Sequence, residues 1–327
     1  MEYRRLGKTG RNVSVIGFGA WAIGADWGTV DDADSLRALH AAADAGVTLI
    51  DTADVYGDGH SEQVIRRFLG ERPGETFFVA TKMGRRVPLD MAEYTPDAFR
   101  AWTDRSRDNL GVDTLDLVQL HCLHPSIYYH PETFAALDEL VAAGAIASYG
   151  VSVERVEEAL KAIEFPGVAT VQIILNMFRQ RPAERFLLEA LRRDVGVLAR
   201  VPLASGLLTG RMSPATHFEP TDHRLFNRHG ASFDRGETFA GVDYETGLEV
   251  VEALRELVPE GATLAQLALR WILMHDGVTA TIPGAKTPDQ ALANAAAADL
   301  TPLPAATMAR NAELYGTRIK SLVHQRW

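Results

Sequence analysis

The sequence TLIDTADVYG, residues 48–57, is an apolar, β-branched run that ends in polar residues. TFFVATK (76–82) and LDLVQLH (115–121) repeat this pattern further along the chain. Runs of this length and composition predict buried β-strands. We therefore expect three successive strands, each of which delivers polar side chains to its end.

Similar runs continue the pattern along the chain; they are VSVIGFG (13–19), IASYGVS (146–152), ATVQIIL (169–175), GVLARVPL (196–203) and VTATIPG (278–284). Amphipathic stretches with recognisable helix ends lie between them, such as the one that Thr95-Pro96 begins and Gly111 ends. Further helices are expected over 131–144 and from Thr263 onward. Strict alternation of eight strands with helices predicts an α/β fold, a (β/α)8 TIM barrel, and no linker divides residues 1–327 into separate domains.

Two segments do not belong to the alternation. The opening YRRLGKTGRNVSVIG (3–17) predicts an N-terminal β-hairpin that covers the far mouth of the barrel. The stretch 211–245 follows the seventh strand and has no clear periodicity. A loop this long in a compact domain is usually functional, so we expect it to close over a bound ligand.

The composition is that of a globular protein, with 46% hydrophobic and 23% charged residues. A formal net charge of −10 argues against nucleic acid or an anionic membrane as the main partner. The single cysteine, Cys122, excludes an intrachain disulfide and the usual zinc-finger spacings. The chain has no apolar signal core and no run long enough to span a bilayer, so a cytoplasmic location is expected.

Asp51, Tyr56, Lys82 and His121 lie at or just past the ends of the three strands quoted first. Active sites of such barrels lie at these strand ends. A free phenol has a pKa near ~10, and a nearby lysine would lower it by favouring the phenolate. An aspartate would hold the lysine, and a histidine could donate a hydrogen bond to a substrate oxygen. The alternative is four unrelated polar residues on loops.

Other site types fit less well. The run from Gly17 to Ala22 matches the loose GxGxxA dinucleotide fingerprint, but no long helix is expected directly after it. No lysine follows a tyrosine by four residues, as a short-chain dehydrogenase requires. His121 and His124 could be metal ligands on a barrel rim, but the other ligands of such a site are missing, and we expect no metal.

The segment DTADVYGDGHSE (51–62) resembles the signature of the aldo-keto reductases. The similarity extends through the ATK and DLVQLH strand ends, GVS (150–152), PLASGLLTGR (202–211) and IPGAKTPDQALAN (282–294). It implies an NAD(P)H-dependent carbonyl reductase in which Tyr56 is the general acid. Lys82 and Asp51 would tune the pKa of Tyr56, and His121 would orient the carbonyl.

The resemblance also implies a cofactor site; its residues would be Gly19, Ala20, Trp21, Asp51, Ser152, Gln172, Arg200, Pro202, Leu203, Gly206, Arg211, Gly284, Lys286, Gln290 and Asn294. Thr287-Pro288 opens a helix, and helix N-termini bind phosphate well. Lys286 beside it favours NADPH over NADH. The chain departs from the family pattern at Val153 (usually Asn), at Arg200 (commonly a stacking Tyr) and at Ala293 (an acidic position).

The substrate pocket is predicted to be walled by Trp21, Trp27, Tyr56 and His121, and Phe178 or the 211–245 loop could complete it. Such walls favour aromatic or medium-sized apolar carbonyl compounds. Two other functions stay open: a cofactor-binding sensor or regulatory subunit with little turnover, and an alcohol or sugar dehydrogenase that works in the oxidising direction. A monomer and a small homo-oligomer both fit, and the sequence does not specify the natural substrate.

Overall fold

The computed structural model describes residues 1–24, 27–28 and 30–327. Within them, eight parallel strands form one sheet in the order of the chain, from β3 to β10. The strands are β3 (Phe18–Gly19), β4 (Leu49–Asp51), β5 (Phe78–Met83), β6 (Leu117–His121), β7 (Tyr149–Val153), β8 (Val168–Ile174), β9 (Gly196–Arg200) and β10 (Ala280–Thr281).

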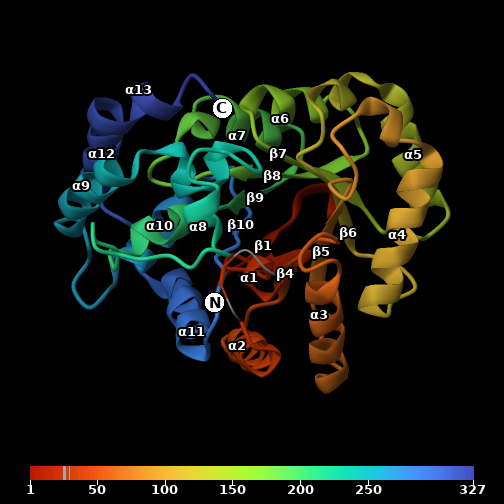
Figure 1. Cartoon of the computed structure of the whole chain (residues 1–327), viewed down its shortest axis with the longest axis horizontal. Coiled ribbons are helices and arrows are strands. Elements are labelled where there is room, and N and C mark those ends of the chain that lie inside the picture. Colours follow the sequence, from red (N-terminus) through yellow and green to blue (C-terminus); the bar gives the residue numbers. More distant parts are fainter. Residues whose placement is uncertain (25–26, 29) are drawn as a thin grey trace.

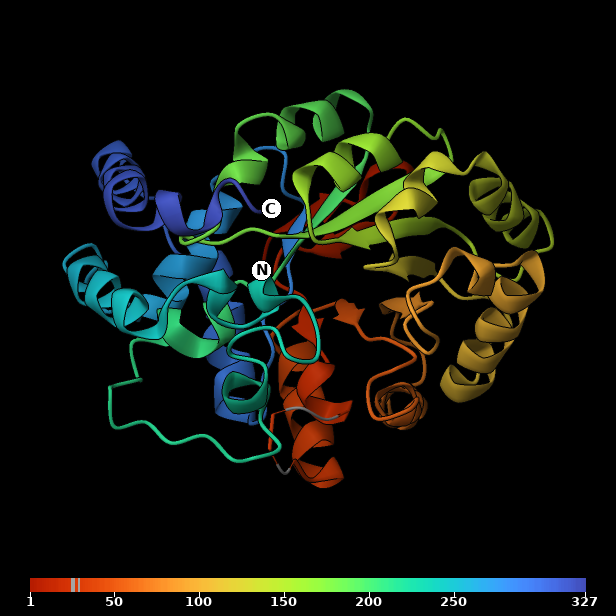
Figure 2. The ribbon, with the colours of Figure 1, turned by 45° about the horizontal axis from the view of Figure 1, so that its top comes forward.

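The first and last strands of the sheet meet. The Gly17 amide donates to Thr281 O at 2.8 Å, the Thr281 amide donates to Val15 O at 2.9 Å, and the Gly19 amide donates to Pro283 O at 3.0 Å. These bonds close the sheet into a cylinder, with helices around it in both views (Figure 1, Figure 2). The predicted (β/α)8 TIM barrel is confirmed.

The helices follow the strands in alternation; they are α1 (Trp21–Gly24), α2 (Asp32–Asp44), α3 (His60–Glu71), α4 (Pro96–Leu110), α5 (Pro131–Ala142), α6 (Val156–Ala162), α7 (Phe186–Arg192), α8 (His223–Phe226), α9 (Tyr244–Arg255), α10 (Leu264–Leu273), α11 (Pro288–Ala295), α12 (Ala305–Leu314) and α13 (Lys320–Val323). The predicted helix ends agree with the observed caps. Thr95 Oγ1 accepts the Ala98 amide at 3.2 Å, and Gly111 has a positive φ of 69°. Thr263 and Gln266 form a reciprocal capping box at the start of α10.

The predicted first strand, 13–19, is split in the structure. Its first part is β2 (Asn12–Ser14), which pairs antiparallel with β1 (Tyr3–Arg5), and its last part is β3. Ser14 ends the hairpin because its hydroxyl donates to Ile16 O at 2.7 Å and accepts the Thr48 amide at 2.9 Å. Through these two hydrogen bonds, the Ser14 side chain fixes the point at which the backbone turns from the hairpin into the barrel.

The hairpin covers one mouth of the barrel, as expected. Leu6 and Val13 are fully buried in a small apolar cluster with residues from the barrel strands, namely Leu49, Phe78, Ala80, Leu117, Leu198 and Ala280. Gly7 has a φ of 48°, and a Cβ there would lie 2.2 Å from the Gly196 nitrogen. The hairpin turn therefore needs glycine, because it touches the barrel backbone directly.

The segment after β9 is more ordered than its sequence suggests. The stretch 211–245, expected to be irregular, contains α8 and short 3-10 turns over Arg235–Glu237 and Phe239–Gly241, and α9 begins at Tyr244. Asp222 caps α8 by accepting the Arg224 amide at 2.9 Å. These elements are too short to show a helical period in the sequence. In the described part of the chain, no helix is long and apolar enough to cross a membrane.

Candidate active site

Lys82 is the centre of the predicted catalytic group. It lies near the end of β5, its side chain is only 1% exposed, and its Nζ donates to three oxygens. These are Asp51 Oδ2 at 2.7 Å, Thr52 O at 2.8 Å and the Tyr56 hydroxyl at 3.2 Å. Burial lowers the pKa of Lys82, but the attraction of Asp51 and Tyr56 raises it above its ordinary value. Lys82 is therefore a charged ammonium that faces the phenol.

Tyr56 is half-buried and follows β4 on a turn. Its hydroxyl contacts Lys82, and its ring lies 4.9 Å from Lys82 Nζ. Burial raises the pKa of Tyr56, while the Lys82 charge lowers it and the more distant Asp51 raises it. The net direction is upward, so the expected net lowering is wrong for this structure, although the Lys82 contribution has the expected sign. Tyr56 is thus a protonated phenol at neutral pH.

His121 ends β6 and lies beside Tyr56, with ring centroids 5.9 Å apart in an edge-on arrangement. Its pKa lies well below the ordinary value because of burial and the positive charges of Arg85, Lys82 and Arg200. The imidazole is therefore neutral and carries one N–H. Its Nδ1 has no hydrogen-bond partner among the described residues. The ring can donate a single hydrogen bond to an oxygen that stands next to Tyr56.

Gln172 on β8 supports this group from across the barrel. Its Nε2 donates to Asp51 Oδ1 at 2.6 Å, so Asp51 has one partner on each oxygen. Ser152 Oγ donates weakly to Gln172 Oε1 at 3.5 Å. Gln172 is thus more than a polar plug at the end of a strand, because its amide fixes the carboxylate that holds Lys82.

A cavity of about 1070 Å³ opens above these residues, at the strand ends expected for the fold. The predicted site residues that line it are Gly19, Trp21, Trp27, Asp51, Tyr56, His121, Ser152, Gln172, Arg200, Pro202, Leu203, Gly206, Arg211, Gly284, Lys286, Gln290 and Asn294. Lys82 and Ala20 do not line it. Ala20 was predicted to contact a cofactor, but it is fully buried and its amide donates to Asp51 O at 2.8 Å.

The far end of the cavity is built around the start of α11. Thr287 Oγ1 accepts the Gln290 amide at 3.3 Å, and Gln290 Oε1 accepts the Lys286 amide at 2.8 Å. Asn294 Nδ2 donates to Gly284 O at 3.1 Å. Lys286 Nζ donates to Trp27 O, so this lysine is not a free, solvated side chain. Its pKa is lowered by burial and then by Arg224.

Aromatic side chains wall the catalytic end. The Trp21 ring stacks toward Tyr56 with centroids 6.2 Å apart, and the Trp27 ring meets Trp21 edge-on at 5.5 Å. Phe233, which the sequence did not single out, lies 5.9 Å from Trp21. Phe178, considered as a further wall, is instead fully buried and does not line the cavity. Phe218 and Glu237 of the 211–245 segment do line the cavity, so this segment completes its wall.

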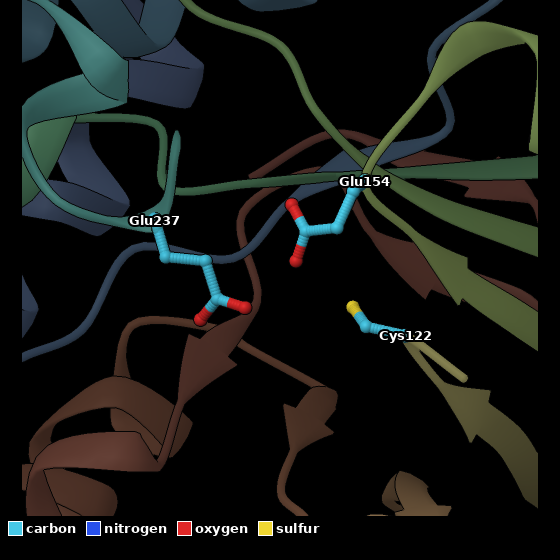
Figure 3. A group of neighbouring side chains, drawn as sticks. All are labelled: Cys122, Glu154 and Glu237. Carbon is cyan, nitrogen blue, oxygen red and sulfur yellow. The ribbon is translucent and has the colours of Figure 1, made fainter. Parts of the chain in front are cut away.

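A group of one thiol and two carboxyl side chains lies next to His121 and was not foreseen from the sequence. Cys122, Glu154 and Glu237 point toward one another, and their sulfur and carboxylate oxygens all lie within 4.8 Å (Figure 3). This is the composition of a metal site, but guanidinium groups already contact the carboxylates. Arg200 Nη2 lies 2.9 Å from Glu154, and Arg85 Nη1 lies 3.1 Å from Glu237. We interpret the group as an ion-pair network.

Trp327 holds the turn that carries Glu237. Its Nε1 donates to Asp234 Oδ1 at 2.8 Å, and the Arg179 guanidinium lies 4.1 Å from its ring centroid. His124 has a local role, because its Nδ1 accepts the Ser126 amide at 3.3 Å in the turn after β6. Short sequence patterns contain no signal for these contacts, since the partners come from distant segments.

Comparison with known proteins agrees with this geometry. The model of the Aldo/keto reductase family matches residues 15–315. The chain belongs to this family. It is therefore an oxidoreductase, and the resemblance seen in the sequence is confirmed.

Related proteins align with this chain over most of both sequences. The aldo-keto reductase YhdN of Bacillus subtilis is 32% identical over 89% of this chain and 86% of its own length. The NADH-specific methylglyoxal reductase of Escherichia coli is 31% identical over 90% of this chain and 93% of its own length. Relatives with different names thus align with most of this chain.

Solved structures of the family are similar. A glycerol dehydrogenase from Gluconobacter oxydans is 30% identical, with a TM-score of 0.76 over 94% of this chain and 93% of its own. An aldo/keto reductase from Klebsiella pneumoniae, in complex with NADP and acetate, is 25% identical, with a TM-score of 0.71 over 96% of this chain and 95% of its own. The fold accepts a nicotinamide dinucleotide in that neighbour.

The residues of this aldo-keto reductase suit such a cofactor. The cavity is lined both by the polar residues around Tyr56 and by residues at the N-terminus of α11. Gly206 adopts a φ of 99°, which allows a tight turn along the cavity wall. Arg211, Arg224 and Lys286 line the cavity and supply positive charge to it. In a chain with a net charge of −10, these cations provide the local charge that a phosphate needs.

Proposed function

We propose that this aldo-keto reductase reduces aldehydes or ketones to alcohols, with NADPH as hydride donor and Tyr56 as proton donor. The observation that supports this most is the contact chain from Asp51 through Lys82 to Tyr56, which opens onto the large cavity. A hydroxyl that is held by an ammonium and faces a cavity has the requirements of a general acid. The expected roles of Asp51, Tyr56, Lys82 and His121 are part of this proposal.

Each residue has a distinct task in the proposed reaction. The nicotinamide supplies the hydride when it is bound. Tyr56 donates its hydroxyl proton to the carbonyl oxygen as that oxygen gains negative charge. The Lys82 ammonium, 3.2 Å from the hydroxyl, stabilises the phenolate that remains. Neutral His121 donates its N–H to the same substrate oxygen and fixes the carbonyl beside Tyr56.

The preference for NADPH rests on charge near the start of α11. Lys286 and Arg224 both line the cavity there, and a 2′-phosphate would replace the Trp27 carbonyl as the partner of Lys286. Relatives differ in this respect, since one is named as NADH-specific and a structural neighbour holds NADP. The choice of cofactor in this chain is therefore proposed from its own cations.

The second candidate function is alcohol oxidation, the reverse of the proposed reaction. The Gluconobacter neighbour is named a glycerol dehydrogenase, and the same four side chains serve alcohol oxidation when Tyr56 accepts the proton. A comparison of initial rates with carbonyl compounds and with the matching alcohols, at neutral and alkaline pH, separates the two directions.

The test of the proposed function is NADPH oxidation with a reactive aromatic aldehyde, 4-nitrobenzaldehyde, followed by absorbance. Wild type, Tyr56→Phe and the control Tyr129→Phe are compared; Tyr129 is 66% exposed and does not line the cavity. We expect Tyr56→Phe to lose about 100-fold to 10,000-fold in turnover, the usual contribution of a general acid. The control should match wild type.

Two results would contradict the proposal. Equal turnover in wild type and Tyr56→Phe would mean that another group donates the proton. Tight cofactor binding without turnover of any aldehyde, ketone or alcohol tested would favour the sensor or regulatory alternative.

A further inference from the structure

Arg200 lies at the catalytic end of the cavity, which it lines together with Tyr56, His121 and Ser152. Its guanidinium is buried and contacts two carboxyl groups, of which Glu237 also lines the cavity and Glu154 does not. Nη2 lies 2.9 Å from Glu154 Oε1, and Nη1 lies 3.8 Å from Glu237 Oε1. A nicotinamide bound at this end would share a water-poor site with the Arg200 charge.

Glu154 and Glu237 are close enough to affect each other's ionisation. Their carboxyl oxygens lie within 4.8 Å of each other (Figure 3). Glu237 is buried, and the Glu154 side chain is only 13% exposed. Burial, together with the Glu237 charge, raises the pKa of Glu154 to about 8 against the opposing effect of Arg200. The charges of Arg85 and Arg200 overcome burial and hold the pKa of Glu237 at about 2. At neutral pH the pair therefore shares one proton, and Glu154 is the more basic of the two carboxyl groups.

Two further charged groups and one thiol act on Glu154, and burial lowers the pKa of Arg179 to about 10, which is still above that of Glu154. Asp234, from the turn before Glu237, and Arg179, from the segment after β8, are opposite in sign. Cys122, from the end of β6, is a neutral thiol because burial raises its pKa. Of the groups around Arg200, Glu154 is thus the carboxyl whose charge changes between neutral and mildly alkaline pH.

We propose that the proton held by Glu154 and Glu237 makes the site discriminate between the oxidised and the reduced nicotinamide. The proposal rests on the proposed function, since it assumes that a nicotinamide binds here. The oxidised ring carries a positive charge and the reduced ring is neutral. While the proton is present, the positive charge of Arg200 is only partly balanced, and the oxidised ring is disfavoured. When the proton leaves to solvent, the negative charge of the Glu154 carboxylate balances the positive charge of Arg200. The oxidised ring then binds more tightly.

This linkage has a direct consequence for turnover. Below the pKa of Glu154 the site holds the reduced cofactor and releases the oxidised product. Above it, the two forms are held more equally, which favours alcohol oxidation. Glu154 acts through Arg200 and is a positioning residue for charge, since it does not line the cavity.

The test measures Kd for NADP⁺ and for NADPH by titration calorimetry at a neutral and an alkaline pH. The ratio of the two constants removes the contributions of the phosphates and the adenosine, which both forms share. We expect the ratio of Kd(NADP⁺) to Kd(NADPH) to fall about tenfold from about pH 7 to about pH 9.5 in wild type. Glu154→Gln, which mimics the protonated side chain, should keep the neutral-pH ratio throughout.

Glu157→Gln is the matched control. Glu157 lies on α6, a few residues away, pairs with Arg181 at the surface and does not line the cavity. Its variant should follow wild type. A wild-type ratio that does not change with pH, or a Glu154→Gln ratio that still falls, overturns the inference while leaving the proposed function intact. Failure of both cofactor forms to bind overturns the inference and the proposed function together.

A measurement on the wild type alone covers the case in which Glu154→Gln does not fold. Calorimetry at about pH 8 in two buffers of different ionisation enthalpy counts the protons released on binding, and Glu154 is then about half protonated. NADP⁺ should release a larger fraction of a proton than NADPH. Equal release by the two forms overturns the inference.

Discussion

Gln172 donates a 2.6 Å hydrogen bond to Asp51 from the opposite side of the barrel. The other oxygen of Asp51 accepts from Lys82 at 2.7 Å. The carboxylate is buried, so each of its oxygens needs a partner. Gln172 therefore belongs to the catalytic support, although β8 is far in sequence from the strands that carry Asp51 and Lys82.

Gln172→Met should lower the free energy of unfolding by about 1–3 kcal/mol, because it leaves a buried Asp51 oxygen without a partner. Gln119→Met is the control. Gln119 is fully buried, and neither its Oε1 nor its Nε2 has a partner in the described part of the chain. Its replacement should be neutral or stabilising. Urea unfolding of both variants checks this, and an equal loss in both would contradict the role of Gln172.

Lys82→Met should cost about 3–5 kcal/mol of stability, because it leaves the Asp51 charge buried and unpaired. It should also abolish most of the turnover. The double variant Lys82→Met/Asp51→Asn should recover stability, since both charges are gone, but not activity. Thermal unfolding and NADPH oxidation are measured on the same samples. Recovery of activity in the double variant would show that Lys82 is a structural residue only.

The lowered pKa of His121 should make the stability of the folded protein depend on pH. The folded protein keeps this imidazole neutral, whereas the unfolded chain binds a proton near its ordinary pKa of ~6.5. The unfolded state then binds more protons below that pH, so stability is full above it and falls as the pH decreases. His121→Gln should reduce this slope. His130→Gln, at an exposed position, is the control and should keep the wild-type slope in urea unfolding between about pH 7 and pH 5.

Lys286→Gln should weaken NADPH binding and leave NADH binding nearly unchanged. The 2′-phosphate would lose its partner, and charge-assisted hydrogen bonds contribute about 1.5–3 kcal/mol. The ratio of kcat/KM for the two cofactors should therefore fall at least tenfold. Lys320→Gln, at the surface and paired with Glu184, is the control. An unchanged ratio would remove Lys286 from the cofactor site.

Trp21→Ala should change the ranking of carbonyl substrates. The Trp21 ring stacks toward Tyr56 and lines the cavity, so its loss should reduce kcat/KM for aromatic aldehydes more than for small ones. Trp102→Ala tests whether lost packing alone has this effect, because Trp102 packs against Phe99 and does not line the cavity. A ranking that stays the same in Trp21→Ala would make Trp21 a packing residue.

The strands and the four candidate catalytic residues could be predicted because they depend on local patterns. An apolar run predicts a strand without reference to the rest of the chain, and Asp51 and His121 stand at the ends of such runs. The barrel then brings these strand ends together. The Arg200–Glu154–Glu237 contacts could not be predicted. Glu237 lies in a segment without a period, and its partners come from other loops. The upward pKa of Tyr56 was also missed, because burial is a property of the assembled site.

The hairpin and the cavity lie at opposite mouths of the same barrel. The end that anchors folding is thus separate from the end that meets ligands. Substitutions in the 211–245 segment do not change the packing of Leu6 and Val13 against the strands. For directed evolution, libraries restricted to the exposed positions of this segment, with the hairpin and the buried Glu237 left intact, should yield altered substrate ranges at little cost in thermostability.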